Sequence, residues 1–149
     1  MFFEALESKD EQKIAKLDRH IPSPRLGECM QNGQVYVLKD DSIKNGGQNH
    51  RGKDPVAGVL RYSLFWQTIP FLDLLYIDEA YRGCGFGAEM MRNWEDTMRL
   101  MGYKYVMTST QADEDAWKFY EKLGYRKVGG FFPLDQNAEE WMYVKRLGD

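Results

Sequence analysis

Residues Phe71–Ala88 read FLDLLYIDEAYRGCGFGA and join a nearly continuous apolar run to a glycine-rich turn. The first seven residues are apolar except for Asp73, which is the pattern of a central strand covered on both faces. Gly83, Gly85 and Gly87 allow a tight turn and close approach of a ligand, because no Cβ stands in the way. Apolar residues at helical spacing follow, so the stretch predicts a strand–turn–helix unit.

The glycine turn also predicts an anion site. The N–H groups that begin a helix have no partner within it, and the helix dipole adds partial positive charge there. Arg82 contributes a fixed charge, so a phosphate group is a suitable ligand. Three interpretations are open: a turn without a ligand, a dinucleotide fingerprint, and the pattern R-x-x-G-x-G.

The dinucleotide interpretation fits the turn poorly. Gly83-x-Gly85-x-x-Ala88 matches G-x-G-x-x-A, but residues 78–82 separate it from the preceding strand. The remaining chain is also too short for the rest of a nicotinamide-binding domain. The phosphate-binding pattern G-x-x-x-x-G-K-[ST] is absent from the sequence.

The rest of the chain predicts alternating helices and strands around this unit. A capping pattern and apolar spacing predict a helix over Ser8–His20, and Ser23-Pro24 predicts a second helix that stops near Gly33. Further helices are expected after the glycine turn, up to Gly102, and around Ala116–Leu123. Strands are expected at Gln34–Lys39, Val56–Trp66, Phe71–Ile77, Tyr103–Thr110, Tyr125–Phe131 and Glu140–Leu147. The order ααββ-βαβαββ predicts an α/β (α+β) fold with a mixed central sheet flanked by helices.

Composition narrows the class of protein. A chain of 149 residues fits a single domain over residues 1–149. A net charge of -3 argues against nucleic acid as a partner, and no apolar run is long enough for a membrane span. Two cysteines and two widely separated histidines do not predict a metal site. Early acids argue against a signal peptide, so a cytoplasmic protein is expected. The polar stretch Asp41–Pro55 is expected to be an exposed loop.

Two segments resemble the GNAT superfamily of acyl-CoA-dependent N-acetyltransferases: LLYIDEAYRGCGFGAEMM (residues 74–91) and DAWKFYEKLGYRKVGGFF (residues 115–132). The resemblance covers about Phe71–Phe132 and implies a mostly antiparallel sheet. It also implies acetyl-CoA as co-substrate, with its diphosphate in the turn and its pantetheine arm along the preceding strand. The implied cofactor-binding residues are Leu75, Tyr76, Ile77, Arg82, Gly83, Cys84, Gly85, Phe86, Gly87 and Ala88.

The resemblance implies that Tyr120 is the general acid. In the family, the tyrosine of the segment FYEKLGY points toward the CoA sulfur. A phenol is protonated at neutral pH and can donate its proton to a departing thiolate. The alternative is that Tyr120 is a core aromatic, because its spacing also places it on the apolar stripe of a helix.

Asp73 is the candidate base or anchor for the substrate. A carboxylate in so apolar a strand is expected to lose hydration, which would raise its pKa toward a useful value. The alternative is a structural carboxylate that binds loop N–H groups. Some family members carry an acid on the next strand, at the position of Thr108, which cannot serve as a base.

Tyr62, Phe65 and Trp66 are candidate acceptor-binding residues, because the resemblance puts the acceptor cleft at the end of their strand. Ordinary core packing is the alternative. The expected reaction is direct transfer of an acetyl group from acetyl-CoA to a primary amine of a small molecule or peptide. The alternatives are a CoA-binding sensor or scaffold module without catalysis and a nucleotide-binding oxidoreductase. Dimers are common in the family, so a homodimer is one expected state.

Overall fold

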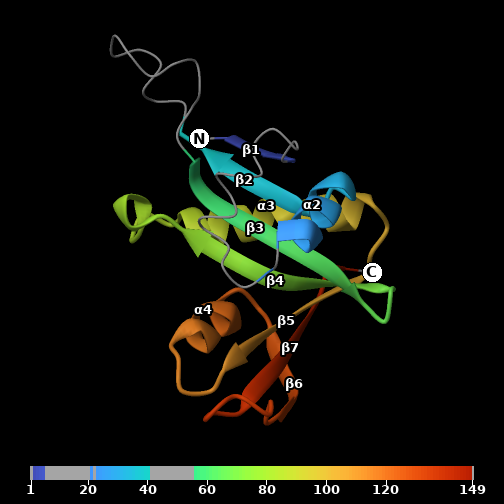
Figure 1. Ribbon diagram of the computed structural model, residues 1–149, viewed down its shortest axis with the longest axis vertical. Helices are drawn as coiled ribbons and strands as arrows, with labels where there is room; N and C mark the ends of the chain where they lie inside the picture. The colour runs from blue at the N-terminus through green and yellow to red at the C-terminus, as the bar shows by residue number, and fades with distance from the viewer. Residues whose placement is uncertain (1, 6–20, 22, 41–55, 149) are drawn as a thin grey trace. The chain divides into compact units, whose positions relative to one another are not determined.

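The structure is a computed structural model that describes residues 2–5, 21, 23–40 and 56–148 (Figure 1). The helix predicted over Ser8–His20 and the loop predicted over Asp41–Pro55 lie outside the described residues. Within the described ranges, no helix is both long enough and apolar enough to cross a membrane.

Among the residues that the structure describes, seven strands form one sheet in the order β1-β2-β3-β4-β5-β7-β6. Strands β4 and β5 are parallel, whereas β1 and β2, β2 and β3, β5 and β7, and β6 and β7 pair in antiparallel fashion. This confirms the predicted mixed, mostly antiparallel sheet. The strands are β1 (Phe2–Ala5), β2 (Val35–Lys39), β3 (Val56–Phe65), β4 (Ile69–Ile77), β5 (Tyr105–Gln111), β6 (Arg126–Phe131) and β7 (Glu140–Arg146).

The predicted order omitted β1. This strand pairs with β2, from Phe2 opposite Lys39 to Ala5 opposite Tyr36. Four residues at the edge of a sheet are too few to show the alternation by which a strand is recognised in a sequence. The chain therefore places a strand ahead of the helices with which the predicted order began.

In the described part of the chain, three α-helices and one turn of 3-10 helix accompany the sheet: α2 (Ser23–Gln31), η3 (Glu79–Tyr81), α3 (Phe86–Leu100) and α4 (Ala116–Lys122). The predicted glycine stops are confirmed at α2 and α3, since Gly33 and Gly102 have φ angles of 69° and 93°. The apolar spacing after the glycine turn also predicts that Met101 lies on the buried face of the helix, which is wrong: Met101 lies beyond the end of α3 and is 58% exposed.

The turn between β3 and β4 is tighter than predicted. The predicted strands, Val56–Trp66 and Phe71–Ile77, leave residues 67–70 for the turn, but β3 ends at Phe65 and β4 begins at Ile69. Trp66 and Gln67 have φ angles of 53° and 56°, and the Thr68 N–H donates to the Phe65 carbonyl at 3.0 Å. Positive φ at both central positions is the signature of a type I′ hairpin turn, which usually contains Asn and Gly.

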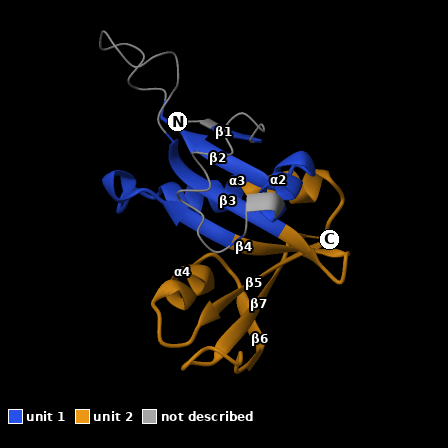
Figure 2. Cartoon of the chain, viewed as in Figure 1, with its two compact units in different colours: residues 1–62, 74–93 blue, residues 63–73, 94–149 orange. Residues whose placement is uncertain are grey.

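The chain divides into two compact units (Figure 2). The first unit comprises Met1–Tyr62 and Leu74–Asn93. Its core includes an apolar cluster from α2, β2 and β3, against which Leu74 of β4 packs: Leu26, Met30, Val35, Val37 and Val59. A Cβ at Gly58 would lie 2.7 Å from the Met90 Sδ and 2.8 Å from the Ile77 Cδ1. The Tyr76 carbonyl oxygen would lie 3.1 Å away, so a larger residue here would displace the ends of these two side chains and crowd the backbone of β4.

The second unit comprises Ser63–Asp73 and Trp94–Asp149. Strand β5 pairs with β7 along its whole length, from Tyr105 opposite Arg146 to Gln111 opposite Glu140, and α4 contacts β5. Buried Glu95 accepts a hydrogen bond from the Tyr125 hydroxyl at 2.9 Å and forms an ion pair with the Lys145 Nζ at 2.6 Å. A buried carboxylate with both partners present fixes its neighbours in one arrangement.

Candidate active site

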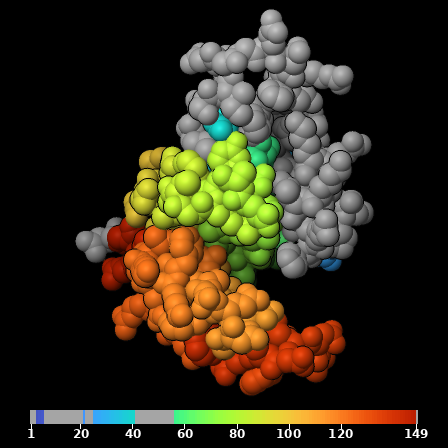
Figure 3. All heavy atoms as spheres, turned by 90° about the vertical axis from the view of Figure 1, so that its left-hand side faces the viewer, coloured from blue at the N-terminus to red at the C-terminus, as the bar shows by residue number. Residues whose placement is uncertain are grey.

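The glycine turn lies where predicted, between β4 and α3, with η3 inserted before it. Gly83 and Gly85 have φ angles of 76° and 83°, a region that favours glycine. A Cβ at either position would meet no heavy atom within 4 Å, so the space in front of the backbone is open. Helix α3 starts at Phe86, and the turn lies on the surface of the molecule (Figure 3). Its free N–H groups suit an anion.

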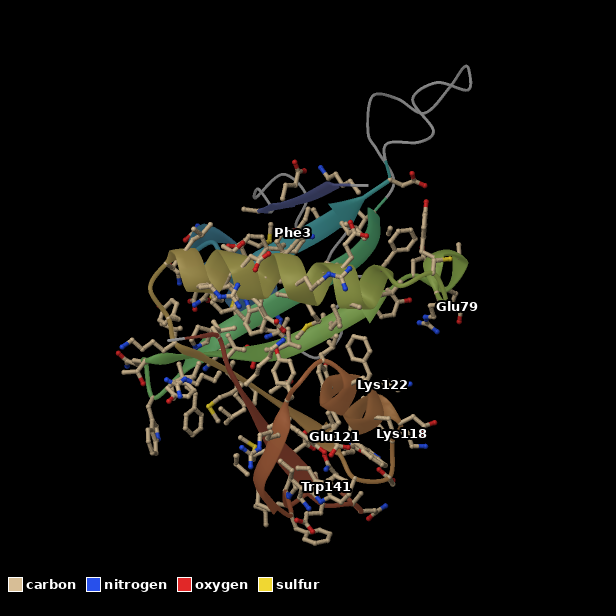
Figure 4. The ribbon with its side chains drawn as sticks, turned by 180° about the vertical axis from the view of Figure 1, so that it is seen from behind. Phe3, Glu79, Lys118, Glu121, Lys122 and Trp141 are labelled. Atoms are coloured by element: carbon tan, nitrogen blue, oxygen red, sulfur yellow. The ribbon has the colours of Figure 1, made fainter. Side chains whose placement is uncertain are left out.

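Arg82 is attached to the strand that precedes the turn. Its Nε donates to the Ile77 carbonyl at 2.9 Å, and its guanidinium lies 5.5 Å from the centre of the Tyr76 ring. Its Nη1 is 4.0 Å from the Oε1 of exposed Glu79, which is labelled in Figure 4. The sequence predicted only a positive charge here. The structure adds a hydrogen bond that ties the turn to the end of β4.

A second contact joins the end of η3, just before the turn, to the residue that follows β2. The Tyr81 hydroxyl donates to the Asp40 Oδ2 at 2.8 Å, and the Tyr81 ring meets the Phe86 ring edge-on at 6.2 Å. This hydrogen bond, together with burial and the Asp40 charge, raises the pKa of Tyr81. Sequence reasoning missed the pair, because 41 positions separate the two residues and neither belongs to a motif.

The other predicted cofactor-binding residues surround the same turn in the first unit. Leu75, Tyr76 and Ile77 are half-buried at the end of β4, and Ala88 is half-buried in the first turn of α3. Cys84 is exposed, and its Sγ lies 3.7 Å from the Arg82 carbonyl oxygen. The structure thus brings the predicted residues together in one segment.

Tyr120 is buried on α4 in the second unit, at 7% exposure. Burial raises its pKa to about 12, and a hydrogen bond with Thr108 offsets part of this rise. The Thr108 hydroxyl donates to the Leu72 carbonyl at 3.2 Å. The opposite face of α4 carries Lys118, Glu121 and Lys122, which are exposed (Figure 4). Because its pKa is raised, Tyr120 is a neutral phenol at physiological pH.

Asp73 differs from expectation. The sequence predicted a carboxylate that loses hydration in an apolar strand, but Asp73 is exposed. Its neighbour Leu72 is buried at 3% exposure, so the two faces of β4 differ at this point. The expected desolvation was wrong because alternation shows which face a residue shares but not what covers that face.

Two of the three predicted acceptor-binding residues line a cavity of about 390 Å³ in the second unit. Its walls also contain residues that sequence reasoning did not select. The lining residues are Ser63, Leu64, Phe65, Trp66, Phe71, Ser109, Phe131 and Met142. Tyr62 does not line this cavity; it is 4% exposed and stacks on Tyr36 with ring centres 6.3 Å apart. Its packing matches the alternative of a core aromatic.

Comparison with known proteins matches this architecture to one family. The model of the acetyltransferase (GNAT) family matches residues 6–125. Acetyltransferase Atu2258 of Agrobacterium fabrum is 29% identical over 77 residues, which are 52% of this chain and 56% of that protein. The match thus spans little more than half of that relative's length.

Two solved structures have the same fold. Ard1 from Thermoplasma volcanium has a TM-score of 0.77 and 15% identity, over 99% of this chain and 98% of that one. Arabidopsis thaliana NAA60 in complex with acetyl-CoA has a TM-score of 0.78 and 14% identity, over 97% of both chains. These likenesses show the fold, and the match of the family model to residues 6–125 shows that the chain belongs to the acetyltransferase (GNAT) family.

Proposed function

We propose that this protein is an N-acetyltransferase that moves an acetyl group from acetyl-CoA to a primary amine of a small molecule or peptide. The observation that carries the proposal is the open glycine turn at the start of α3, where Gly83 and Gly85 have positive φ. Membership of the family supports the reaction class, and the NAA60 neighbour contains acetyl-CoA.

The turn is the proposed site of the CoA diphosphate. Main-chain N–H groups from Gly83 to Ala88 would bind its oxygens, because unpartnered N–H groups at the start of a helix attract phosphate. The backbone of Leu75–Ile77 would bind the pantetheine arm as an added strand does. Arg82 contributes positive charge and, through Ile77, keeps the turn at a fixed distance from the strand.

Tyr120 is the proposed acid, and Asp73 the proposed base. The acceptor nitrogen forms a bond to the acetyl carbon, and the bond from that carbon to the CoA sulfur breaks. The sulfur takes the phenolic proton of Tyr120. The proton that the acceptor nitrogen releases passes through water to exposed Asp73 and on to solvent, and Tyr120 regains a proton from water.

Thr108 is the proposed positioning residue for Tyr120. The single proton of its hydroxyl goes to the Leu72 carbonyl, so in the resting state Tyr120 donates to the Thr108 oxygen. When Tyr120 gives up its proton, the Thr108 hydroxyl can turn toward the phenolate. A hydrogen bond donated to the phenolate would stabilise the deprotonated form, and Thr108 shifts the pKa of Tyr120 in that direction, against the larger effect of burial.

The test combines binding with turnover. Acetyl-CoA binding is measured by calorimetry, and thiol release is then followed with a broad panel of primary amines. Thiol release together with an acetylated amine in the mass spectrum is the expected result. Binding without release for any amine would instead support a CoA-binding module without catalysis. Protection against thermal unfolding by NADH but not by CoA would overturn the proposal.

A further inference from the structure

The cavity in the second unit has an aromatic wall. Phe65 and Phe71 lie stacked with ring centres 6.2 Å apart, and Trp66 lies 5.0 Å from Phe65. Phe131 and Met142 complete the apolar lining. Aromatic rings attract one another beyond the effect of buried area, and a thioether sulfur adds a favourable contact. A volume of about 390 Å³ lies within the usual range for small-molecule sites.

The lining carries no formal charge. Within the described part of the chain, its polar members are two serines, Ser63 and Ser109, and it includes no Asp, Glu, Lys or Arg. A polyamine acceptor would place a second ammonium group in the cavity. That group would lose its hydrating water without gaining a carboxylate partner, which is unfavourable. A flat, uncharged group gains contacts on several sides. The cavity therefore favours an aromatic group over a polyamine chain.

The backbone at the cavity is held in an unusual conformation. Trp66 has a φ of 53° and is 80% exposed, although a large side chain with positive φ is uncommon. Phe131 is 53% exposed on β6. Two large aromatic side chains thus line the cavity while they remain accessible to solvent, and a bound ring would cover both.

The cavity also adjoins the residues that position Tyr120. Phe71 and Ser109 are the immediate chain neighbours of Leu72 and Thr108, which lie opposite each other in the register of β4 and β5. We infer that the acceptor is an arylalkylamine: a primary amine whose attached group is an aromatic ring that binds in this cavity. This inference rests on the proposed acetyl transfer. Free arylalkylamines and peptides that begin with Phe or Trp share this chemistry.

The test compares acceptors that differ in one property. Phenethylamine and 2-cyclohexylethylamine differ in aromaticity, and spermidine adds charge in place of the ring. We expect kcat/KM for phenethylamine to exceed that for cyclohexylethylamine by about threefold to tenfold, and that for spermidine by roughly a hundredfold. Tryptamine and peptides that begin with Phe or Trp show which source supplies the ring. Equal or higher values for spermidine would overturn the inference.

Two neighbouring residues give a matched pair of variants. Phe131→Ala removes a cavity wall on an edge strand, whereas Phe132→Ala removes an exposed ring that does not line the cavity. We expect Phe131→Ala to raise KM for phenethylamine by about tenfold with KM for acetyl-CoA unchanged, and Phe132→Ala to change neither. Equal effects of the two variants would contradict the assignment of the cavity.

Failure of this inference is distinguishable from failure of the proposed function. Acetyl transfer to polyamines or polar peptides, with none to arylalkylamines, would leave the acetyltransferase activity intact and overturn the acceptor assignment. Calorimetric titration of phenethylamine into the protein saturated with CoA measures the cavity without turnover. Binding that Phe131→Ala weakens supports the inference even for an inactive chain, and no binding overturns it.

Discussion

The Thr108 hydroxyl donates a hydrogen bond to the Leu72 carbonyl at 3.2 Å, across the pair of residues that lie opposite each other where β4 and β5 run parallel. Both residues are buried, and the same hydroxyl meets the phenol of Tyr120. A contact within the sheet thereby orients the proposed acid on α4. The hydroxyl that contacts the Tyr120 phenol is thus itself held by a backbone carbonyl.

Thr108→Val should slow the reaction without weakening donor binding. Valine keeps the shape but offers Tyr120 no partner, so the phenol becomes a weaker acid. We expect kcat to fall by about tenfold, with KM for acetyl-CoA unchanged and the Tyr120 pKa raised further in an ultraviolet titration. Thr108→Ser should restore both values. Thr110→Val is the matched control, since buried Thr110 has no hydroxyl partner among the described residues.

Tyr120→Phe should remove the proposed acid and leave the fold intact. We expect kcat to fall by roughly tenfold to a thousandfold, with the affinity for acetyl-CoA nearly unchanged in calorimetry. Tyr143→Phe alters another buried tyrosine, on β7, and should retain the activity of the unaltered protein. A Tyr120→Phe protein with an unchanged rate would exclude this residue from the mechanism.

Gly85→Val should abolish acetyl-CoA binding, but it also places a branched residue at a φ of 83°. Gly85→Asn separates the two effects, because asparagine tolerates positive φ and still fills the open space before the turn. We expect the asparagine variant to bind acetyl-CoA about tenfold to a hundredfold more weakly, the loss of a charge-assisted hydrogen bond.

Gly33→Asn provides the control for this series. Gly33 ends α2 with a φ of 69° and equally open surroundings. Its variant should bind acetyl-CoA normally. Full affinity in Gly85→Asn would remove the diphosphate from the turn.

Arg82→Lys should distinguish anchoring from charge. Lysine retains the positive charge but cannot reproduce the Nε hydrogen bond to the Ile77 carbonyl. If anchoring matters, the dissociation constant of acetyl-CoA should rise roughly fivefold to tenfold. Arg92→Lys, at an exposed position on α3, should leave it unchanged. Equal affinity for Arg82→Lys and the unaltered protein would assign Arg82 a purely electrostatic role.

Buried tyrosines should make the fold sensitive to alkali. Burial first, and then the Glu95 carboxylate, raises the pKa of Tyr125 well above the usual range of a tyrosine, and burial raises the pKa of Tyr120 to about 12. Above pH 10 the unfolded chain has lost protons that the folded chain retains. The free energy of unfolding should therefore fall as pH rises, by about 1.4 kcal/mol per pH unit for each tyrosine.

Urea titrations between pH 9 and 12 measure this slope. Tyr125→Phe should lower stability at pH 8 by about 1–3 kcal/mol, because the Glu95 Oε2 loses its donor. The same variant should also reduce the slope of the free energy of unfolding against pH by the contribution of one tyrosine. Phe132→Ala, which removes an exposed ring that has no titratable group, should not alter the slope. An unchanged slope in Tyr125→Phe would contradict the prediction.

Local signals account for the parts of the fold that sequence reasoning predicted. Glycines at positions 83 and 85 mark a backbone that only they adopt easily, and the apolar period after them gives α3 its length. The hairpin turn could not be placed in this way. Trp66 and Gln67 both have positive φ, but neither is a residue type that is typical of such turns. When the packing of the rest of the fold determines the conformation of a short turn, the residues of that turn do not reveal it.

Sequence motifs selected the residues of the candidate site, but they could not show which distant residues meet there. The role of Tyr120 stays a prediction from its segment, whereas its contact with Thr108 follows only from the register of β4 and β5. The contact between Tyr81 and Asp40 joins positions 41 apart in the chain. Asp73 shows the limit of alternation, since its exposure depends on what packs over β4.

At the hairpin of Trp66 and Gln67, the residues that would give the most stable turn differ from the residues that line the cavity. Residues held at positive φ without glycine or asparagine cost of order 1–3 kcal/mol each, and Asn-Gly would fit this turn without strain. Replacement of Trp66 by Asn and of Gln67 by Gly should therefore increase the free energy of unfolding. The same exchange would delete an aromatic wall of the cavity. A thermostabilised variant obtained by repairing this turn would carry a changed acceptor preference as its side effect.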